Sequence, residues 1–481
     1  MTLSSVRLGT ADGALAKALT AIRGELDVSA DFPPEVEAEA TAAVASVALP
    51  EPSLLDVPFF TIDPADAMDL DQAMHLERTD TGYRVRYAIA DVARFIEPGG
   101  AIDREARTRG QTLYPPDGRI PLHPTVLSEG AASLLPGEVR GAYVWTFELD
   151  PDARLVSTGI VRARVRSRRR YSYEEVQGLA DGGAPPAELG LLKEFGLARI
   201  ALEQERGGAS LGRPDQEVRE VDGHYRLTRR RPLEAEGWNA QVSLLTGMAA
   251  AHLMLEGGIG ILRTMPPPDA EAVAWFRRRA TALGTPWEPG VGYGAYLRTL
   301  DPSDPAQLAI LHAAASLFRG AGYEAFDGAP SEHPVQSAVA APYAHATAPL
   351  RRLVDRFVLV VCEALANGRD VPDWVRGALP ELPAFMASSD GVAGRLDHAV
   401  MSAVEAAVLR DRVGETFPAT VIDAKDGGGE LQLDDVAVTA RCEGRVVPGE
   451  RVMATLVTAD IATGTVLFRV DASRERRIRA S

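Results

Sequence analysis

The spacing of hydrophobic residues changes along the chain, and each spacing predicts a different kind of element. Residues 11–26 are rich in Ala and Leu, and the segment Asp31-Phe-Pro-Pro-Glu35 supplies a capping residue and prolines before a second helical stretch that ends near Val47. From about residue 57 the apolar period falls to two. Two pairs of alternating stretches, each joined by a turn-forming segment, predict hairpins: 74–76 with 83–89, and 143–149 with 154–165.

Helical spacing dominates from residue 173 to about residue 412, with expected helices at 269–283, 305–319, 348–366 and 391–412. After Gly414 five short strands are expected, at 417–424, 430–434, 436–442, 451–458 and 465–470. Five strands in so short a segment indicate a small barrel. The OB type often binds oligonucleotides, and another small barrel is the alternative.

These patterns predict an α+β protein in four parts. A small helical module, in which a helix-turn-helix element is one alternative, covers residues 1–54. A large domain with a mixed sheet and surrounding helices covers 55–412, a five-stranded barrel covers 413–474, and a basic tail covers 475–481.

Composition sets outer limits on the function. The two cysteines cannot build a disulfide framework, and no stretch has the length of a signal peptide core or a membrane span, so a cytoplasmic protein without membrane contact is expected. The net charge of −16 argues against a nucleic-acid partner. Arginine nevertheless gathers in runs at 162–170, 229–231 and 277–279, each of which is either a solvated face or a phosphate-binding surface.

Four aspartates follow the apolar run 57–62 within nine residues: Asp63, Asp66, Asp69 and Asp71. Carboxylates buried together need a compensating positive charge, and a divalent ion with oxygen ligands, such as Mg²⁺, is the simplest one. If residues 67–74 are extended, Asp69 and Asp71 point to one side, and Asp63 reaches the same ion across the turn at Pro64. Turn and cap positions are the ordinary alternative for such residues. A calcium loop of the helix–loop–helix type fits poorly, since its Gly and terminal Glu are missing.

The acidic segment Thr61-Ile-Asp-Pro-Ala-Asp-Ala-Met-Asp-Leu-Asp71 resembles that of the ribonuclease II family, the RNB-domain exoribonucleases. The last barrel resembles the S1 type of OB fold. Further segments resemble the same family in the same order: 89–99, 102–110, 113–122, 127–129, 133–140, 263–268 and 343–352. The resemblance implies a processive hydrolase that degrades single-stranded RNA from 3′ to 5′ and releases nucleoside 5′-monophosphates. It implies Mg²⁺, with Mn²⁺ as the alternative, and two ions that stabilise the attacking and leaving oxygens.

The resemblance also assigns residues. Asp63, Asp69 and Asp71 take the catalytic and metal-binding positions, and Gln72 stands at a further metal position where the family usually has Asp. Gln keeps an acceptor oxygen but lacks the charge, which implies a more weakly held ion. The remaining assignments are Arg351 as the catalytic arginine, Asp397 near the position of a catalytic Glu, and Tyr114 and Tyr173 as RNA-binding aromatics.

Alternatives stay open for several of these residues. Tyr114 is otherwise a ring packed on Pro115 and Pro116, and Arg351 with Arg352 is otherwise a surface pair. The family's two cold-shock barrels would not fit into the residues before the core, so a short helical module is expected in their place. Besides the exoribonuclease, which is expected to act as a monomer on single-stranded RNA, two other functions remain: an RNA-holding protein without catalysis, supported by Gln72, and a regulator whose first helices bind duplex DNA.

Overall fold

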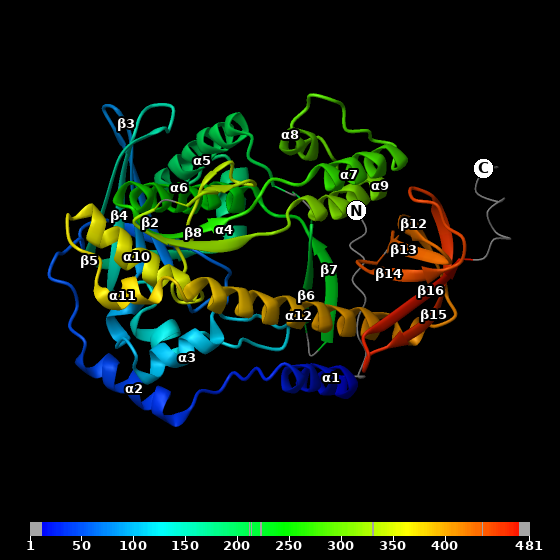
Figure 1. The fold of residues 1–481 in the computed structure, drawn as a ribbon, viewed down its shortest axis with the longest axis horizontal. Coiled ribbons are helices and arrows are strands. Elements are labelled where there is room, and N and C mark those ends of the chain that lie inside the picture. Colours follow the sequence, from blue (N-terminus) through cyan, green and yellow to red (C-terminus); the bar gives the residue numbers. More distant parts are fainter. Residues whose placement is uncertain are drawn as a thin grey trace.

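The computed structural model describes residues 12–210, 212, 214–221, 224–329, 331–434 and 436–470, so the predicted basic tail lies outside the described residues. A large α/β body and a small β-barrel stand at opposite ends of the molecule, and one long helix runs between them (Figure 1). The predicted α+β class is therefore confirmed. None of the described helices is long and apolar enough to cross a membrane.

The large body is built around a first closed barrel of five strands. In barrel order these are β1 (Phe59–Ile62), β2 (Gln72–Thr79), β3 (Gly82–Ala90), β4 (Val139–Leu149) and β5 (Leu155–Tyr171). Neighbouring strands are antiparallel, and the parallel pairing of β1 with β5 closes the barrel. Both predicted hairpins are present. The side chains of β3 point alternately into two separate hydrophobic cores. Val85 and Tyr87 belong to the core that the barrel shares with the covering helices, and Ala88 and Ala90 belong to a smaller core.

Helices and short ribbons cover this barrel. The apolar sides of α5, α6 and α10 form the largest core together with the barrel. The covering elements are η1 (Val92–Phe95), α3 (Ala101–Arg109), the π-turn η2 (Leu127–Ala131), α4 (Tyr173–Asp181), α5 (Ala187–Arg206), α6 (Glu234–Gly257), β8 (Ile259–Thr264) with β9 (Gly322–Asp327), β10 (Val335–Gln336) with β11 (Ala341–Pro342), α10 (Leu353–Ala366) and α11 (Asp373–Ala378).

A smaller helical group packs around its own aromatic cluster beside the second barrel. Phe276, Trp287 and Tyr296 lie within contact distance of one another, and Ile422 of the second barrel joins their core. The group consists of α7 (Ala270–Ala282), α8 (Tyr293–Arg298), α9 (Pro305–Ala314) and η3 (Ala315–Leu317).

The long helix α12 (Leu382–Leu409), followed by η4 (Arg410–Arg412), leads into the second barrel (Figure 1). This barrel has the strand order β12-β13-β14-β16-β15, with β14 and β16 parallel. Its strands lie close to their predicted positions: β12 (Thr416–Lys425), β13 (Gly428–Leu433), β14 (Thr439–Glu443), β15 (Arg451–Asp460) and β16 (Thr465–Val470). The hairpin of β6 (Asp215–Val221) and β7 (His224–Arg230) packs on α12 and fastens the barrel, because Gln216 donates to Glu405 of α12 and to the carbonyl of Ala437.

The two N-terminal helices dock on separate parts of the molecule. Helix α1 (Asp12–Glu25) packs along α12 and buries Leu15, Ala18 and Leu19 in the core of the second barrel. Helix α2 (Pro34–Ser46) packs against α3 instead. This separate docking gives no support to a helix-turn-helix element.

The arginine run on β5 is largely used by the chain itself. Arg162 pairs with the buried Asp91 at 2.9 Å and stacks on Tyr143. Others tie down the segment that precedes β1 and the turn after it: Arg164 to the carbonyl of Glu51, Arg168 to that of Asp56, and Arg170 to that of Ala67. These contacts favour the structural interpretation of the run over a phosphate-binding surface.

Candidate active site

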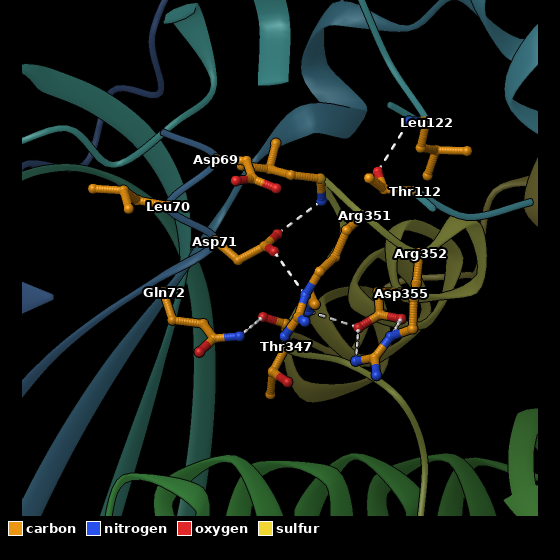
Figure 2. Close-up of polar contacts among 12 residues, drawn as sticks. Asp69, Leu70, Asp71, Gln72, Thr112, Leu122, Thr347, Arg351, Arg352 and Asp355 are labelled. Atoms are coloured by element: carbon orange, nitrogen blue, oxygen red, sulfur yellow. Dashed lines mark hydrogen bonds and ion pairs between the residues drawn. The ribbon is translucent and has the colours of Figure 1, made fainter. Parts of the chain in front are cut away.

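The acidic segment between β1 and β2 is held by buried backbone contacts rather than by strand pairing. Leu70 is fully buried, its N–H donates to Ser133 Oγ at 2.9 Å, and its carbonyl accepts from Leu134 N–H at 3.0 Å. Because Leu70 points into the core, Asp69 and Asp71 point together to the opposite side, as Figure 2 shows. The predicted shared side of these two aspartates is thus present, although strand β2 begins only at Gln72.

Asp71 is the most buried of the acids, with 3% of its surface exposed. The backbone N–H of Leu350 donates to its Oδ1 at 2.8 Å, and the Nε of Arg351 lies 3.4 Å from its Oδ2. Burial raises the pKa of Asp71 to about 8, although the Arg351 charge and the Leu350 hydrogen bond act in the opposite direction. The protein's own groups therefore compensate this carboxylate only in part.

Asp63 follows β1 and faces the same region. Its Oδ2 is buried without a hydrogen-bond partner among the described residues. Burial raises the pKa of Asp63 to about 6, the negative charge of Asp69 adds to this effect, and the charge of Arg351 opposes it. Two neighbouring carboxylates that lack positive charge match the hard oxygen ligands that Mg²⁺ and Mn²⁺ prefer.

Asp69 is the acid with the most protein contacts. Arg119 Nη1 lies 2.8 Å from its Oδ1, and the hydroxyl of Tyr114 donates to its Oδ2 at 3.1 Å. The other terminal nitrogen of Arg119 lies 3.0 Å from Glu129. Asp69 is thus neutralised by the protein, unlike Asp63 and Asp71.

The side chain of Gln72 is turned toward the protein. Its Nε2 donates to the carbonyl of Thr347 at 2.5 Å (Figure 2). Its Oε1 accepts from the hydroxyl of Tyr87 at 2.9 Å. Both polar atoms of the amide are therefore engaged. The protein thus holds the Gln72 side chain in place, while Oε1 keeps a second lone pair beside the one that accepts from Tyr87. The assignment of Gln72 as a metal ligand stays a prediction.

Arg351 lies on a loop that is fastened on several sides. Its carbonyl accepts from the N–H of Thr112 at 2.9 Å, while Asp355 accepts from the N–H of Ala348 at 2.7 Å and from Arg352 at 2.8 and 2.9 Å. Arg352 is consequently packed inside, whereas the side chain of Arg351 stays 47% exposed. Of these two arginines, only Arg351 exposes enough of its side chain to contact a ligand. The two side chains therefore differ in environment, unlike two neighbouring arginines on an open surface.

The remaining predicted residues border the same region. A cavity of about 310 Å³ is lined by Tyr114, Arg351 and Asp397, among others. Helix α12 supplies Asp397, whose pKa is raised by partial burial. Tyr114 is 50% exposed, so one ring face is open to a base.

Tyr173 begins α4, and its hydroxyl accepts from Asn239 at 3.0 Å. Its pKa is raised to about 12, first by burial and then by the charge of Asp63, which places the ring near that acid. The roles of Tyr114 and Tyr173 as RNA-binding aromatics stay predictions.

The three aspartates do not form a closed ligand set. Throughout the described part of the chain, no group of three or more His, Cys, Asp or Glu side chains is arranged closely enough to hold a metal ion. The donor chemistry nevertheless fits a hard cation beside Asp63 and Asp71, as the unpaired Oδ2 of Asp63 indicates. The gathering of the three acids around a metal ion and the individual metal ligands both stay predictions.

Sequence reasoning missed four residues that shape this site: Tyr87, Arg119, Glu129 and Asp355. Arg119 lies within the segment 113–122 that carried the resemblance. Its place in the same segment as the predicted RNA-binding Tyr114 is the one local sign that it belongs to the site. Glu129 ends the segment 127–129 that also carried the resemblance, whereas Asp355 comes from a distant segment, and only the fold reveals the contacts of both.

Comparisons with known proteins agree with this geometry. Residues 53–367 match the family described as the RNB domain, and residues 415–471 match the RNase II-type exonuclease C-terminal S1 domain. Ribonuclease R of Acidithiobacillus ferrooxidans is 41% identical over 131 residues, which are 27% of this chain and 30% of that protein. Ribonuclease R of Chlamydia muridarum is 27% identical over 420 residues, which are 84% of this chain and 59% of that protein. The chain spans less than two thirds of the length of these relatives.

Solved structures share the fold at low sequence identity. Mycoplasma genitalium RNase R in complex with ribose-methylated single-stranded RNA has a TM-score of 0.85 at 18% identity, covering 96% of this chain and 79% of that one. Yeast Ssd1, described as a pseudonuclease, has a TM-score of 0.70 at 17% identity, covering 84% of this chain and 52% of that one. Because the match to the RNB domain alone covers more than half of the residues, this chain belongs to the RNB-domain family and carries an RNase II-type S1 domain at residues 415–471.

Proposed function

We propose that this chain is a Mg²⁺-dependent exoribonuclease that degrades single-stranded RNA processively from 3′ to 5′ and releases nucleoside 5′-monophosphates. The observation that carries the proposal is the buried Asp71, which accepts from the Leu350 N–H and lies 3.4 Å from the exposed Arg351. Membership in the RNB-domain family and the S1 barrel support it.

The proposed roles follow from charge and position. Asp63 and Asp71, with Asp69 beside them, would hold the divalent ion, which when bound stabilises the phosphoryl oxygens and activates the attacking water. Arg351 has an exposed guanidinium beside Asp71 and would stabilise negative charge that develops on the phosphoryl group. Asp397, which lines the same cavity, is assigned to proton exchange.

Strand binding is assigned to Tyr114 and Tyr173. A ring face accepts any base, as an enzyme that degrades RNA of any sequence requires. Tyr114 is anchored by its hydroxyl on Asp69, so that a base stacked on its ring would bring the adjoining phosphate toward the acids. We further propose that the protein acts as a monomer in the reducing cytoplasm, in keeping with its two buried free cysteines.

A second candidate function is RNA binding without hydrolysis. Two observations favour it: Gln72 contributes no charge to the site, and yeast Ssd1, which shares the fold, is described as a pseudonuclease. The retained acids and Arg351 favour hydrolysis over this candidate.

One experiment separates the two functions. The full chain is incubated with a single-stranded RNA labelled at its 5′ end, with Mg²⁺ or with a chelator, and the released products are resolved by size. Processive hydrolysis from the 3′ end predicts that in Mg²⁺ the labelled strand is converted directly to a short 5′-terminal remnant, while the unlabelled nucleoside 5′-monophosphates that are released are detected by chromatography; neither product is expected with chelator. Intact RNA that remains bound in Mg²⁺ would favour the second candidate.

A further inference from the structure

Asp69 already has a cation of the protein's own. Arg119 Nη1 contacts its Oδ1 at 2.8 Å, and the Tyr114 hydroxyl occupies its Oδ2 at 3.1 Å. Asp63 and Asp71 have no comparably close cation: Asp63 has a buried oxygen without a hydrogen-bond partner, and Asp71 accepts from the Leu350 N–H and lies 3.4 Å from Arg351. The three carboxylates therefore divide into one that is neutralised and two that are not.

Arg119 is fixed in this position from several sides. Glu129 binds its second terminal nitrogen at 3.0 Å, so the guanidinium bridges two acids. The loop itself is closed by paired backbone hydrogen bonds between Leu113 and Ile120, each of 2.9 Å. Arg23 of α1 additionally pairs with Asp117 in the same loop.

The charges of this group agree with a single ion. Four carboxylates, Asp63, Asp69, Asp71 and Glu129, are accompanied by three guanidinium groups: Arg119, Arg351, and Arg170, whose charge also acts on Asp63. With all seven groups ionised, the balance of four negative and three positive charges is −1, so one divalent cation brings it to +1 and two would bring it to +3. Two divalent cations would leave a larger excess of positive charge in a partly buried place, which is costly.

We propose that Arg119 takes the place of the second metal ion, so that this chain binds one divalent cation, on the side of Asp63 and Asp71. The inference rests on the proposed function and replaces the two ions predicted from the sequence. Arg119 is then a positioning residue, which holds Asp69, the acceptor of the Tyr114 hydroxyl. Gln72 agrees with this arrangement, because a further acid is not required when Arg119 supplies permanent charge.

The test counts bound ions without RNA. The full chain is titrated with Mn²⁺ at physiological salt, and free Mn²⁺ is measured by electron paramagnetic resonance. The wild type is expected to bind one Mn²⁺ per chain. Arg119→Met releases Asp69 and Glu129 and is expected to bind two, and the double variant with Asp69→Asn is expected to return to one. Asp69→Asn alone is expected to keep the single ion, whereas Asp71→Asn loses it.

A matched control removes another arginine that pairs with a carboxylate. Arg154→Met breaks the exposed pair with Glu205, remote from the acids, and is expected to leave the count at one. Two ions or none in the wild type would overturn the inference, and so would an unchanged count and affinity in a folded Arg119→Met protein. RNA degradation with two bound ions would overturn only the inference, whereas one bound ion without RNA hydrolysis would overturn only the proposed function.

Discussion

The backbone N–H of Leu350 donates to Oδ1 of Asp71 at 2.8 Å and so joins residues that are 279 positions apart in the sequence. The adjacent Gln72 binds the carbonyl of Thr347 in the same loop. Two consecutive residues of the acidic segment thus hold the loop that carries Arg351. The acids and the arginine are fixed relative to each other before any ligand is present, which is the preorganisation that electrostatic catalysis requires.

Replacing Asp71 with Asn separates charge from structure. Asn retains an oxygen that accepts from the Leu350 N–H, so the loop is expected to stay in place while the negative charge is lost. We expect turnover of single-stranded RNA to fall by at least roughly 10²- to 10³-fold, the usual cost of removing one electrostatic group at a reacting centre. RNA affinity is expected to change little. Single-turnover degradation and RNA-binding titrations measure the two effects.

Asp66 supplies the matched control for this substitution. It lies exposed in the same segment, and Asp66→Asn removes an equal charge. Its turnover is expected to equal that of the wild type. Asp71→Asn protein that degrades RNA at nearly the wild-type rate would contradict the role of Asp71.

Gln72→Asp distinguishes two interpretations of that position. The sequence interpretation predicts tighter metal binding and a lower Mg²⁺ concentration for half-maximal rate. The structure predicts the opposite, because Asp cannot donate to the Thr347 carbonyl and places a charge near it. We expect a destabilisation of roughly 1–3 kcal/mol, the range for an unpaired buried group. The Mg²⁺ requirement is expected to stay the same or to rise.

Tyr87→Phe provides a graded comparison for Gln72→Asp. It removes the hydroxyl that donates to Gln72 Oε1 but leaves the bond from Gln72 to Thr347 intact. A smaller loss of stability and a nearly normal rate are expected. If Gln72→Asp protein reached half-maximal rate at clearly lower Mg²⁺ than both wild type and Tyr87→Phe, the metal-ligand assignment would be supported.

The regular parts of the fold were accessible from the sequence because their determinants are local. The alternation in 83–89 and the turn at Asp80-Thr-Gly82 are sufficient to predict the β2–β3 hairpin, and five such stretches predict the second barrel. The shared side of Asp69 and Asp71 also follows from local geometry, since the apolar Leu70 between them turns into the core.

The partners of the site residues were not accessible in this way. Nothing near Gln72 in the sequence indicates that Thr347 and Tyr87 will occupy its amide, and nothing near Asp69 indicates Arg119. Such contacts arise only when distant segments pack together. A resemblance assigns a residue to a position but not to a partner, which is why the contacts of the Gln72 amide with Thr347 and Tyr87 were not foreseen.

Helix α1 offers a test of stability rather than of RNA binding. Leu19 is 1% exposed and packs in the core that α1 shares with α12 and the second barrel. Leu19→Ala is expected to destabilise the protein by about 2–4 kcal/mol, the usual cost of such a cavity. Urea denaturation measures this change. Leu197→Ala, at an exposed position of α5, is the control and is expected to have little effect. Equal denaturation midpoints for the two variants would show that α1 is not part of the folded core.

The contact between α12 and the β6–β7 hairpin predicts a dependence of stability on pH. Burial raises the pKa of Glu405 to about 7 from an ordinary 4.5, so between these values the native state holds a proton that the unfolded chain releases. Stability contributed by this group is therefore lost as pH rises through the window. Glu405→Gln keeps an acceptor for Gln216 without the charge, and we expect it to be more stable than the wild type by roughly 1–2 kcal/mol at pH 8 and nearly equal at pH 4.5. Thermal unfolding at several pH values measures the difference.

Glu271→Gln, on the exposed side of α7, is the control and is expected to show no such dependence on pH. If the difference in stability between the wild type and Glu405→Gln were the same at pH 4.5 and pH 8, the pKa of Glu405 would not be raised in the folded state.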